Sequence, residues 1–518
     1  MKRILTLLIA LLLLVSVCGC QRQEAEYVPT GNALVMDDGS TVDTRPTEAQ
    51  EADLELQLVY NPDNPLNPLL NGDYTNRALQ SLLYQGLFSV DRSYQVEPVL
   101  CKSFSVTDDM MTYRFYLEDA CFSDGTRLTE EDVAASLNAA RESEYYSGRF
   151  QYVSSIEVSP TGGVTISLKT PYENFPILLD VPILRASQLE LENPVGTGPY
   201  VFEQGAGDAR MRLNTNWWCA EEAELLFQSQ VISLLTEKDN TKIRDAFEFA
   251  DLNLVCTNPA SDKYADYRGD YELWDCENGI FVYLGCNMGS NLFYDSTVRS
   301  ALTYAIDRQK LADTYYRGFG LAASLPASPK SPWYDETLAQ RYAYDSDRFV
   351  KALEESGMLE TPFPLVLLVN KDDTLRLRVA RDIGEMLTEC GLSVEMKEVS
   401  TTEYQEALLY REYDLYVGQT RLSANMDLSQ FFSEYGNLSK GAIDDSSLYA
   451  LCLESLANSG NYYNLHKQIM EDGRICPVLF CGYAVYATRG VLSDLEPARD
   501  NIFWYSLGKN MESARIGG

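Results

Sequence analysis

The chain has 518 residues, of which 45% are hydrophobic and 23% charged, and this composition predicts a folded protein with more than one compact lobe. Its 42 basic and 76 acidic residues give a formal net charge of −34, which argues against nucleic-acid binding because such a surface repels phosphate backbones. The single histidine, His466, leaves no multi-histidine metal site, and we expect neither a metal nor a cofactor.

The N-terminus predicts an export signal. Two basic residues precede an apolar run at 4–17, which is too short to span a bilayer as a helix. The run ends in Val17-Cys18-Gly19-Cys20, which resembles the lipobox of bacterial lipoproteins. We therefore expect residues 1–19 to be a lipoprotein signal peptide and Cys20 to carry the lipid. A signal that is cleaved without lipidation, or a short buried helix, are the alternatives.

The mature protein is expected to lie outside the cytoplasm, anchored to the bacterial cell membrane. No second apolar stretch has the length of a transmembrane helix, so the lipid would be the only membrane anchor. Residues 20–50 are polar and acidic, which predicts a flexible linker attached to the lipid. A short hairpin around residues 37–40 is the alternative for part of this segment.

The hydrophobic periodicity predicts both strands and helices along the rest of the chain. The first half predicts strands at 54–60, 113–117 and 164–168, a proline-rich loop at 61–68, a helix at 78–88 and a helix from Thr129 to about Ala140. The second half predicts helices at 298–316 and 375–390, the latter ending at Gly391, and strands at 364–369, 392–399 and 413–417. This order of elements indicates the α/β class.

The cysteines allow two interpretations. Ten of them follow Cys20, and none forms a C-x-x-C motif. Outside the cytoplasm, the pairs Cys276/Cys286 and Cys101/Cys121 are close enough in sequence to form disulfides. The alternative is that all ten are buried thiols that act as small hydrophobic residues.

Five stretches of the chain share the order and spacing of one family. They are Glu97-Pro98-Val99-Leu100 with Tyr113-Arg114-Phe115-Tyr116-Leu117, Phe122-Ser123-Asp124-Gly125-Thr126 with Leu128-Thr129-Glu130-Glu131-Asp132-Val133, Val195-Gly196-Thr197-Gly198-Pro199-Tyr200, Asn216-Trp217-Trp218, and Val298-Arg299-Ser300-Ala301-Leu302-Thr303-Tyr304-Ala305-Ile306-Asp307-Arg308. Together they resemble the family 5 extracellular solute-binding proteins, the peptide- and nickel-type receptors of ABC importers. The resemblance extends from about residue 54 to about residue 507.

We expect these motif residues to stabilise the fold and not to bind ligand. Gly196 and Gly198 would let the backbone turn sharply, and Asp124-Gly125 would form a turn before the next helix. Arg299 and Asp307 would form ion pairs within the domain.

The resemblance implies a two-lobed periplasmic-binding-protein-like clamshell with an extra subdomain inserted in lobe I. By that resemblance, lobe I holds residues 51–85, 196–275 and 480–518, the inserted subdomain holds 86–195, and lobe II holds 276–479. Two crossovers, near 271–285 and 476–486, would form the hinge. Ligand would bind in the cleft and favour the closed form.

The resemblance also indicates which loops would face the cleft. Peptide-binding members carry an aspartate in a lobe II loop where this chain has Ala424, so Asp427 is the alternative partner for a peptide ammonium group. Arg421 in the same loop could hold a carboxylate or phosphate, or could form an internal salt bridge. The expected ligand contacts are Asn64, Pro65, Leu66, Thr420, Arg421, Leu422, Ala424, Asp427, Phe480 and Tyr483.

The implied function is that of a lipid-anchored, monomeric substrate-binding component of an ABC importer, with a permease and an ATPase as partners. We expect the solute to be an oligopeptide. A non-peptide solute such as an oligosaccharide, or a role as a receptor for signalling peptides, are the alternatives. We expect no enzymatic activity, since no pair of acidic residues is marked as catalytic by its surroundings.

Overall fold

The structure is a computed structural model. It describes residues 34–35, 41–42, 56–70, 73–205, 208–221, 223, 229–261, 264, 266–360, 364–439, 443–492 and 495–516. The predicted signal peptide and Cys20 lie outside the described residues, as does most of the predicted linker. Within that linker, strand β1 (Leu34–Val35) pairs antiparallel with β2 (Thr41–Val42), which agrees with the hairpin alternative.

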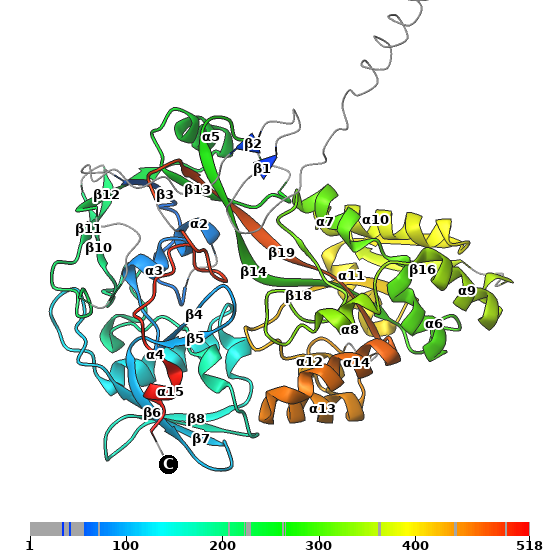
Figure 1. The fold of residues 1–518 in the computed structure, drawn as a ribbon, viewed down its shortest axis with the longest axis horizontal. Helices are drawn as coiled ribbons and strands as arrows, with labels where there is room; N and C mark the ends of the chain where they lie inside the picture. The colour runs from blue at the N-terminus through cyan, green and yellow to red at the C-terminus, as the bar shows by residue number, and fades with distance from the viewer. Residues whose placement is uncertain are drawn as a thin grey trace, which may run out of the picture.

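We call lobe I the part of the molecule that contains two four-stranded sheets (Figure 1). The first sheet has the order β10-β11-β12-β3, with β10 at Tyr200–Gln204, β11 at Ala209–Leu213, β12 at Val231–Thr236 and β3 at Leu56–Tyr60. The helices that accompany this sheet are α2 (Tyr74–Arg77), α3 (Gln80–Leu83) and α5 (Asn240–Glu248). Leu56, Leu58 and Tyr60 of β3 pack in the lobe I core, and Val59 on the other face is also buried, so β3 is more buried than the half-buried strand that its alternation predicts.

The second sheet of lobe I is antiparallel and belongs to the segment predicted as the inserted subdomain. Its order is β6-β7-β9-β8, with β6 at Cys101–Val106, β7 at Thr112–Leu117, β9 at Val164–Leu168 and β8 at Val153–Val158. Helix α4 (Glu130–Glu142) packs against β8 and β9 and begins with a capping box between Thr129 and Asp132. The remaining elements of this region are β4 (Phe88–Val90), β5 (Val96–Pro98), the 3-10 helices η1 (Ser147–Phe150), η2 (Phe175–Leu178) and η3 (Ala186–Gln188), and α15 (Met511–Ala514).

We call lobe II the part that contains β16, β17 and β18 with the helices around them. A seven-stranded sheet has the order β13-β19-β14-β18-β16-β17, and β15 pairs with β19. Its strands are β13 (Leu254–Thr257), β14 (Tyr271–Cys286), β15 (Leu321–Ala322), β16 (Leu365–Asn370), β17 (Val394–Val399), β18 (Leu415–Arg421) and β19 (Ile475–Thr488). The helices are α6 (Ser296–Ala301), η4 (Leu302–Ala305), α7 (Arg308–Tyr316), α8 (Glu336–Gln340), α9 (Ser346–Ser356), η5 (Met358–Glu360), α10 (Thr374–Glu389), α11 (Thr401–Tyr410), α12 (Ser429–Phe432), α13 (Ser446–Ala457), η6 (Ser459–Asn461) and α14 (Tyr462–Asp472).

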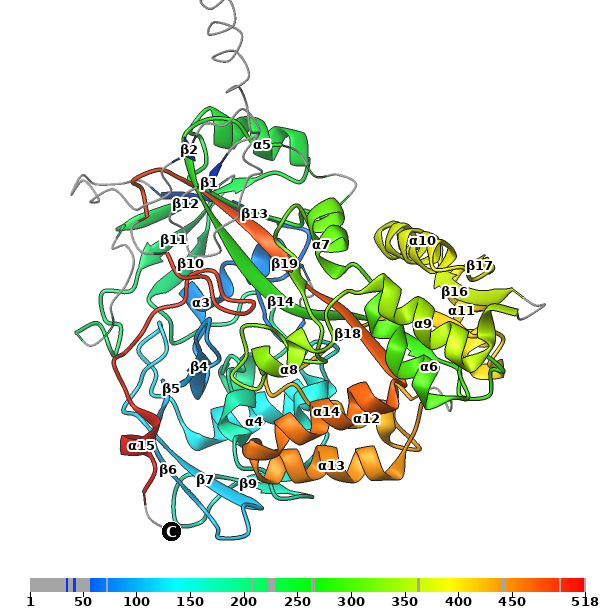
Figure 2. The same cartoon turned by 45° about the vertical axis from the view of Figure 1, so that its right-hand side comes forward.

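The long strands β14 and β19 join the two lobes. They lie side by side and run from the sheets of lobe I into lobe II, as both ribbon views show (Figures 1 and 2). The pairing between them shifts register after Glu277 and resumes at Phe281. Gly279 lies in this irregular stretch with φ +70, a left-handed conformation that favours glycine. The two strands coincide with the segments expected as the hinge, and hinge motion itself stays a prediction.

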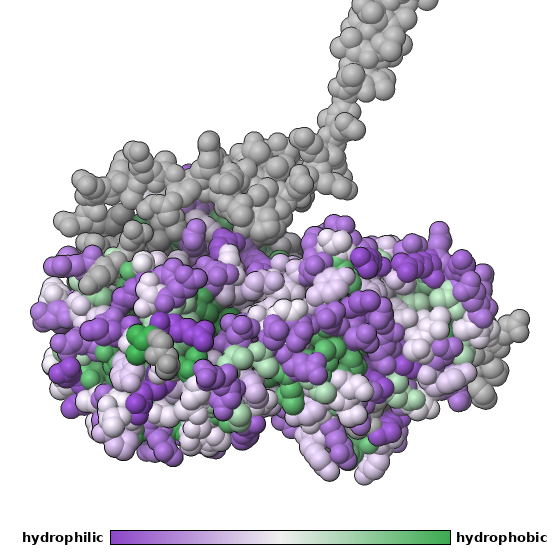
Figure 3. Space-filling view, turned by 60° about the horizontal axis from the view of Figure 1, so that its bottom comes forward, coloured by the Kyte–Doolittle hydropathy of each residue, from purple (hydrophilic) through white to green (hydrophobic). Residues whose placement is uncertain are grey.

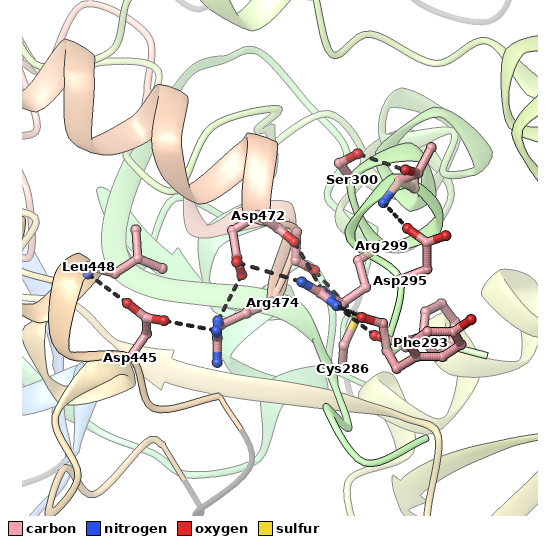
Figure 4. A network of polar contacts seen from close by, with 12 residues as sticks. Cys286, Phe293, Asp295, Arg299, Ser300, Asp445, Leu448, Asp472 and Arg474 are labelled. Carbon is pink, nitrogen blue, oxygen red and sulfur yellow. Dashed lines mark hydrogen bonds and ion pairs between the residues drawn. The ribbon is translucent and has the colours of Figure 1, made fainter. Parts of the chain in front are cut away.

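The motif arginine Arg299 has the structural role expected of it (Figure 4). Its buried guanidinium donates hydrogen bonds to the carbonyls of Phe293, Tyr294 and Asp472 and lies 3.6 Å from the Asp472 carboxylate. The network fastens the loop before α6 to the end of α14, and Arg474 extends it to Asp445 in the same lobe. Asp307 accepts a hydrogen bond from the backbone N–H of Lys310 and caps α7, so the ion pair expected of Asp307 is replaced by a helix cap.

The motif glycines Gly196 and Gly198 are explained by close approach. A Cβ at Gly198 would lie 2.6 Å from the Leu83 carbonyl carbon, and a Cβ at Gly196 would overlap the same peptide group. Neither glycine has a positive φ. Space against the end of α3, and not a special turn conformation, is therefore what requires glycine here.

Most of the predicted elements are confirmed within a few residues of their expected bounds, but two helices are not. The helix predicted at 78–88 ends at Leu83, because Tyr84 is extended and Phe88 begins β4. The helix predicted at 298–316 is broken into α6, η4 and α7 at Ile306, which is extended with φ −103 and ψ 109. Hydrophobic spacing alone did not reveal these breaks.

All ten cysteines between Cys101 and Cys481 are described, and they are free thiols, most of them buried. The disulfides considered at Cys276/Cys286 and Cys101/Cys121 are therefore not formed. Among the described helices, none has the length and apolar character needed to cross a membrane. The molecular face in Figure 3 is mostly hydrophilic, with hydrophobic residues in small scattered groups.

Candidate functional site

A cavity of about 100 Å³ lies in lobe I beside its contact with lobe II. It is formed where α2 and α3, β4, the segment after α4 and the C-terminal segment 499–505 meet. Its lining residues are Arg77, Gln80, Ser81, Tyr84, Gln85, Gly86, Phe88, Ser89, Val90, Val99, Tyr145, Tyr146, Arg149, Asp180, Pro182, Arg499, Asp500, Asn501, Trp504 and Tyr505. We call this space the arginine cavity, because three arginines line it.

Two of these arginines come from lobe I elements that pack around Tyr145 and Tyr146. Arg77, in the last turn of α2, is 8% exposed, and its guanidinium lies over the Tyr145 ring at 3.6 Å from the ring centre. Within the described residues, no carboxylate forms an ion pair with Arg77. Arg149 forms an ion pair with Asp180; burial acts to lower its pKa, but the carboxylate outweighs burial and raises it.

The third arginine, Arg499, and its neighbour Asp500 project from a tight turn. The turn is closed by hydrogen bonds between the backbones of Ala498 and Asn501, and Asp500 has φ +57. Aspartate is among the non-glycine residues that adopt this left-handed conformation most readily. Arg499 reaches across to lobe II and donates a hydrogen bond to the carbonyl of Leu422.

Asp500 is the point where the two lobes meet at the cavity. Its Oδ2 accepts hydrogen bonds from Arg421 of β18 at 2.8 Å and from the Tyr145 hydroxyl at 2.6 Å. Burial acts to raise the pKa of Asp500, but the guanidiniums of Arg421, Arg499 and Arg77 outweigh it, so that this pKa lies below its usual value. The Asp500 carboxylate is therefore ionised and lies among these three guanidinium groups.

The cavity wall holds several polar atoms that have no hydrogen-bond partner among the described residues. They are Gln80 Nε2, Ser81 Oγ, Ser89 Oγ, Arg499 Nε, Asp500 Oδ1, Asn501 Oδ1 and Trp504 Nε1. Buried polar groups are nearly always hydrogen-bonded, so a group of such atoms around one cavity indicates a place where water or a ligand supplies the missing partners.

A second set of polar contacts joins the lobes along β14. Glu277 accepts hydrogen bonds from the Tyr94 hydroxyl of lobe I at 2.6 Å and from Ser328 at 2.8 Å. Asp275 is paired with Lys330 and lies 3.5 Å from Arg92. Burial raises the pKa of Glu277, which these hydrogen bonds only partly offset. The lobes are thus in direct contact along β14.

Asp427, the expected partner for a peptide ammonium group, lies away from the arginine cavity. It accepts hydrogen bonds from the backbone and hydroxyl of Ser429, each at 2.9 Å, and from Gln151 of lobe I. Burial raises the pKa of Asp427 to about 6. Both carboxylate oxygens of Asp427 accept hydrogen bonds from protein groups, and the bond from Gln151 connects lobe II to lobe I.

The other expected ligand contacts fall in separate places. Leu66, Leu422, Ala424 and Phe480 have buried side chains, and Phe480 stacks on Phe281 inside lobe II. Asn64 hydrogen-bonds Asp73 and Asn76 in the loop after β3, where Pro65 follows it, and Thr420 pairs with Phe281 in the sheet. Arg421, Tyr483 and the backbone carbonyl of Leu422, which accepts from Arg499, are brought near the cavity. Ligand contact by the other residues stays a prediction.

The Tyr483 ring stacks on that of Tyr74 in lobe I, with 5.4 Å between the ring centres. The charges of Asp500 and Arg421 both act on its hydroxyl. Burial raises its pKa first, with the charge of Asp500 adding to the rise and that of Arg421 opposing it.

The sequence-based prediction missed Arg77, Tyr145, Arg499 and Asp500. A usable signal existed for two of them: Arg499-Asp500 is the only charged pair in the aromatic stretch 497–508. Arg77 is likewise the only basic residue between positions 54 and 91. Neither signal identifies a site until the fold brings the two segments together.

Comparison with known proteins identifies the family. The model of the bacterial extracellular solute-binding proteins, family 5 (middle region), matches residues 95–441, which is more than half of the chain. The oligopeptide-binding protein AppA of Bacillus subtilis (strain 168) is 24% identical over 391 residues, or 69% of this chain and 71% of AppA. The glutathione-binding protein GsiB of Salmonella typhi is 24% identical over 347 residues, or 64% of this chain and 66% of GsiB.

A solved structure of AppA from Clostridium difficile has the same fold. It superposes with a TM-score of 0.70 at 17% identity, covering 87% of this chain and 98% of that chain. The expected two-lobed α/β fold is thereby confirmed. Because the family model matches more than half of its residues, the chain belongs to the family 5 bacterial extracellular solute-binding proteins.

Proposed function

We propose that the chain is the substrate-binding component of an ABC importer, which captures a solute between lobes I and II and delivers it to a membrane permease that works with an ATPase. The observation that carries this proposal is the arginine cavity, where lobe I supplies a wall of unpartnered polar atoms and Arg421 of lobe II pairs with Asp500 of lobe I at its edge. A solute that binds both sides of such a contact favours the closed form.

The domain boundaries given above belong to this proposal. The lobes would move about β14 and β19, the two long strands that connect them. The break in their pairing after Glu277 supplies an irregular stretch where backbone angles can change without unpairing the whole ladder.

The chemical class of the solute is part of the proposal. The names of AppA and GsiB, an oligopeptide-binding and a glutathione-binding protein, support a peptide. Ala424 is 3% exposed and carries no charge, and the Asp427 carboxylate is bonded to protein, so an anchor for a peptide ammonium would have to come from elsewhere. Asp500 Oδ1, which has no partner among the described residues, is the available acceptor.

The binding function is tested by native mass spectrometry of a soluble form that begins at Gln21. The protein is measured as purified, after mild unfolding and refolding, and after addition of candidate solutes. A binding protein forms a one-to-one complex and releases the solute chemically unchanged. Recovery of a converted product at more than one equivalent would contradict the proposal and indicate an enzyme.

The lipid anchor is proposed at Cys20 and has its own test. Cys20→Ala is expected to prevent incorporation of a labelled palmitate and to release the protein from the membrane fraction. Cys18→Ala is the matched control and is expected to retain both. Membrane retention of the Cys20 variant, or loss of label from the Cys18 variant, would contradict the assignment.

A further inference from the structure

The arginine cavity has an excess of positive charge in a strongly acidic chain. Arg77, Arg149 and Arg499 line it against two aspartates, Asp180 and Asp500, and Arg421 adds a fourth guanidinium from lobe II. Two guanidinium charges therefore exceed the carboxylates around one small space, although the whole chain carries a formal charge of −34.

Arg77 is the least compensated of these groups. Asp180 pairs with Arg149, Asp500 pairs with Arg421, and Arg499 bonds to a backbone carbonyl. Arg77 lies over the Tyr145 ring and is near enough to Asp500 to lower its pKa, but it forms no ion pair among the described residues. It is 8% exposed. A buried cation whose nearby carboxylate is already paired with another arginine is only partly compensated, and a bidentate anion is the partner that a guanidinium fits best.

Further polar atoms that line the same cavity have no hydrogen-bond partner among the described residues. Gln80 Nε2, Ser81 Oγ, Ser89 Oγ and Trp504 Nε1 can donate, whereas Asp500 Oδ1 and Asn501 Oδ1 can accept. Donors therefore predominate near the arginines, as a carboxylate requires. At roughly 10–15 Å³ for each water position, the cavity holds about seven to ten waters, which is the space of a compact solute.

From these observations we propose that the arginine cavity binds a compact, carboxylate-bearing solute, with Arg77 as the carboxylate ligand and Asp500 Oδ1 accepting a donor group at its other end. This inference rests on the proposed solute-binding function and names the class of solute. The carboxylate belongs either to a small organic acid or to the C-terminus of a short peptide.

The test is a thermal-shift and calorimetric titration of the full chain in mild detergent. The probes are succinate, citrate and glutamate, the peptides Ala-Ala and Ala-Ala-Ala, and the amide counterpart of each. At least one carboxylate is expected to raise Tm by several degrees while its amide has no effect. Stabilisation by a free acid identifies a small organic acid, and stabilisation by a peptide that is lost on C-terminal amidation identifies a peptide.

Variants locate the binding in this cavity. Arg77→Gln is expected to weaken the stabilising carboxylate about 10- to 100-fold, the usual effect of losing a charged hydrogen bond. Ser89→Ala, which removes a hydroxyl without a protein partner, keeps the folded state intact and should also weaken binding. Arg381→Gln is the control, because the Arg381 side chain is exposed on the surface of α10 and pairs with Glu398.

Two results would overturn the inference. One is that no carboxylate stabilises the protein more than its amide does. The other is that both cavity variants bind with unchanged affinity. If a sugar or an amidated peptide binds and the carboxylates do not, the binding function stands and only the solute class is wrong. If a carboxylate binds and is chemically converted, the solute class stands and the proposed function is wrong.

Discussion

The guanidinium of Arg421 in lobe II lies 2.8 Å from the carboxylate of Asp500 in the C-terminal segment of lobe I. The side chain of Asp500 is 12% exposed and that of Arg421 is 28% exposed, so the pair is mostly shielded from water. A contact of this kind joins segments that are far apart in the sequence, and it does so at the edge of the arginine cavity. It is one of several polar contacts between the two lobes, and the one that lies beside this cavity.

Removal of that carboxylate should therefore destabilise the protein. In Asp500→Asn, Arg421 loses its counter-ion while it remains largely buried, and we expect the free energy of unfolding to fall by about 3 kcal/mol. Urea titration followed by circular dichroism measures this change. Asp266→Asn is the matched control, because Asp266 pairs with Arg317 on an exposed surface and should cost less than about 1 kcal/mol. Equal effects of the two variants would mean that the interlobe pair has no special role.

Gly279 is expected to control the position of Arg499. A Cβ at Gly279 would overlap the Arg499 guanidinium, and the residue also has φ +70. Gly279→Ala should cost about 1–3 kcal/mol and weaken solute binding, because Arg499 must move. Gly125 has φ +82 with no atom near its Cβ position, so Gly125→Ala should cost about 1 kcal/mol with binding unchanged. If solute affinity falls equally in both variants, the effect is not due to Arg499.

The single histidine, His466, should contribute to the loss of the free energy of unfolding at acidic pH. His466 is buried in α14, and burial lowers its pKa from 6.5 to about 4. Because the folded state binds this proton less readily than the unfolded state, stability falls as the pH drops below 6.5 and the loss is complete below 4. Between pH 7 and pH 4, the wild-type chain should lose about 3 kcal/mol more than His466→Leu does. Parallel pH profiles for the two proteins would contradict this reasoning.

The buried cysteines should be unreactive until the protein unfolds. Burial raises the pKa of Cys276 and Cys286 above the usual thiol value, and the thiolate is the form that reacts. Without a reducing agent, a form beginning at Gln21 should react with ten equivalents of a thiol reagent in denaturant and with far fewer in the native state. A total below ten in denaturant would show that disulfides form, contrary to the structure.

The sequence predicted the fold well because the family motifs encode packing. The capping box of Thr129 and Asp132 depends on residues three positions apart, and Gly196 is required by close approach of the backbone. Features of this kind restrict the residue type at a position and can therefore be recognised in the sequence. Helix breaks at Tyr84 and Ile306 were missed because hydrophobic spacing continues across them while the backbone turns.

The candidate site was predicted far less completely than the fold. Arg421 was identified from its loop, and its role as an internal salt bridge was one of the two interpretations given for it. Arg77 and Asp500 could not be linked to it, since they lie 423 positions apart in the chain and meet only in three dimensions. Ligand contact by Phe480 was expected from the family resemblance alone, and in the structure this side chain is buried and stacks on Phe281.

A crystal structure of the protein with a stabilising carboxylate would show directly where the solute binds. The account predicts electron density for the solute in the arginine cavity, with a carboxylate within hydrogen-bond distance of Arg77 and Ser89 and with the Arg421–Asp500 contact intact. Density for the solute at any other place, with the arginine cavity filled only by water, would contradict it.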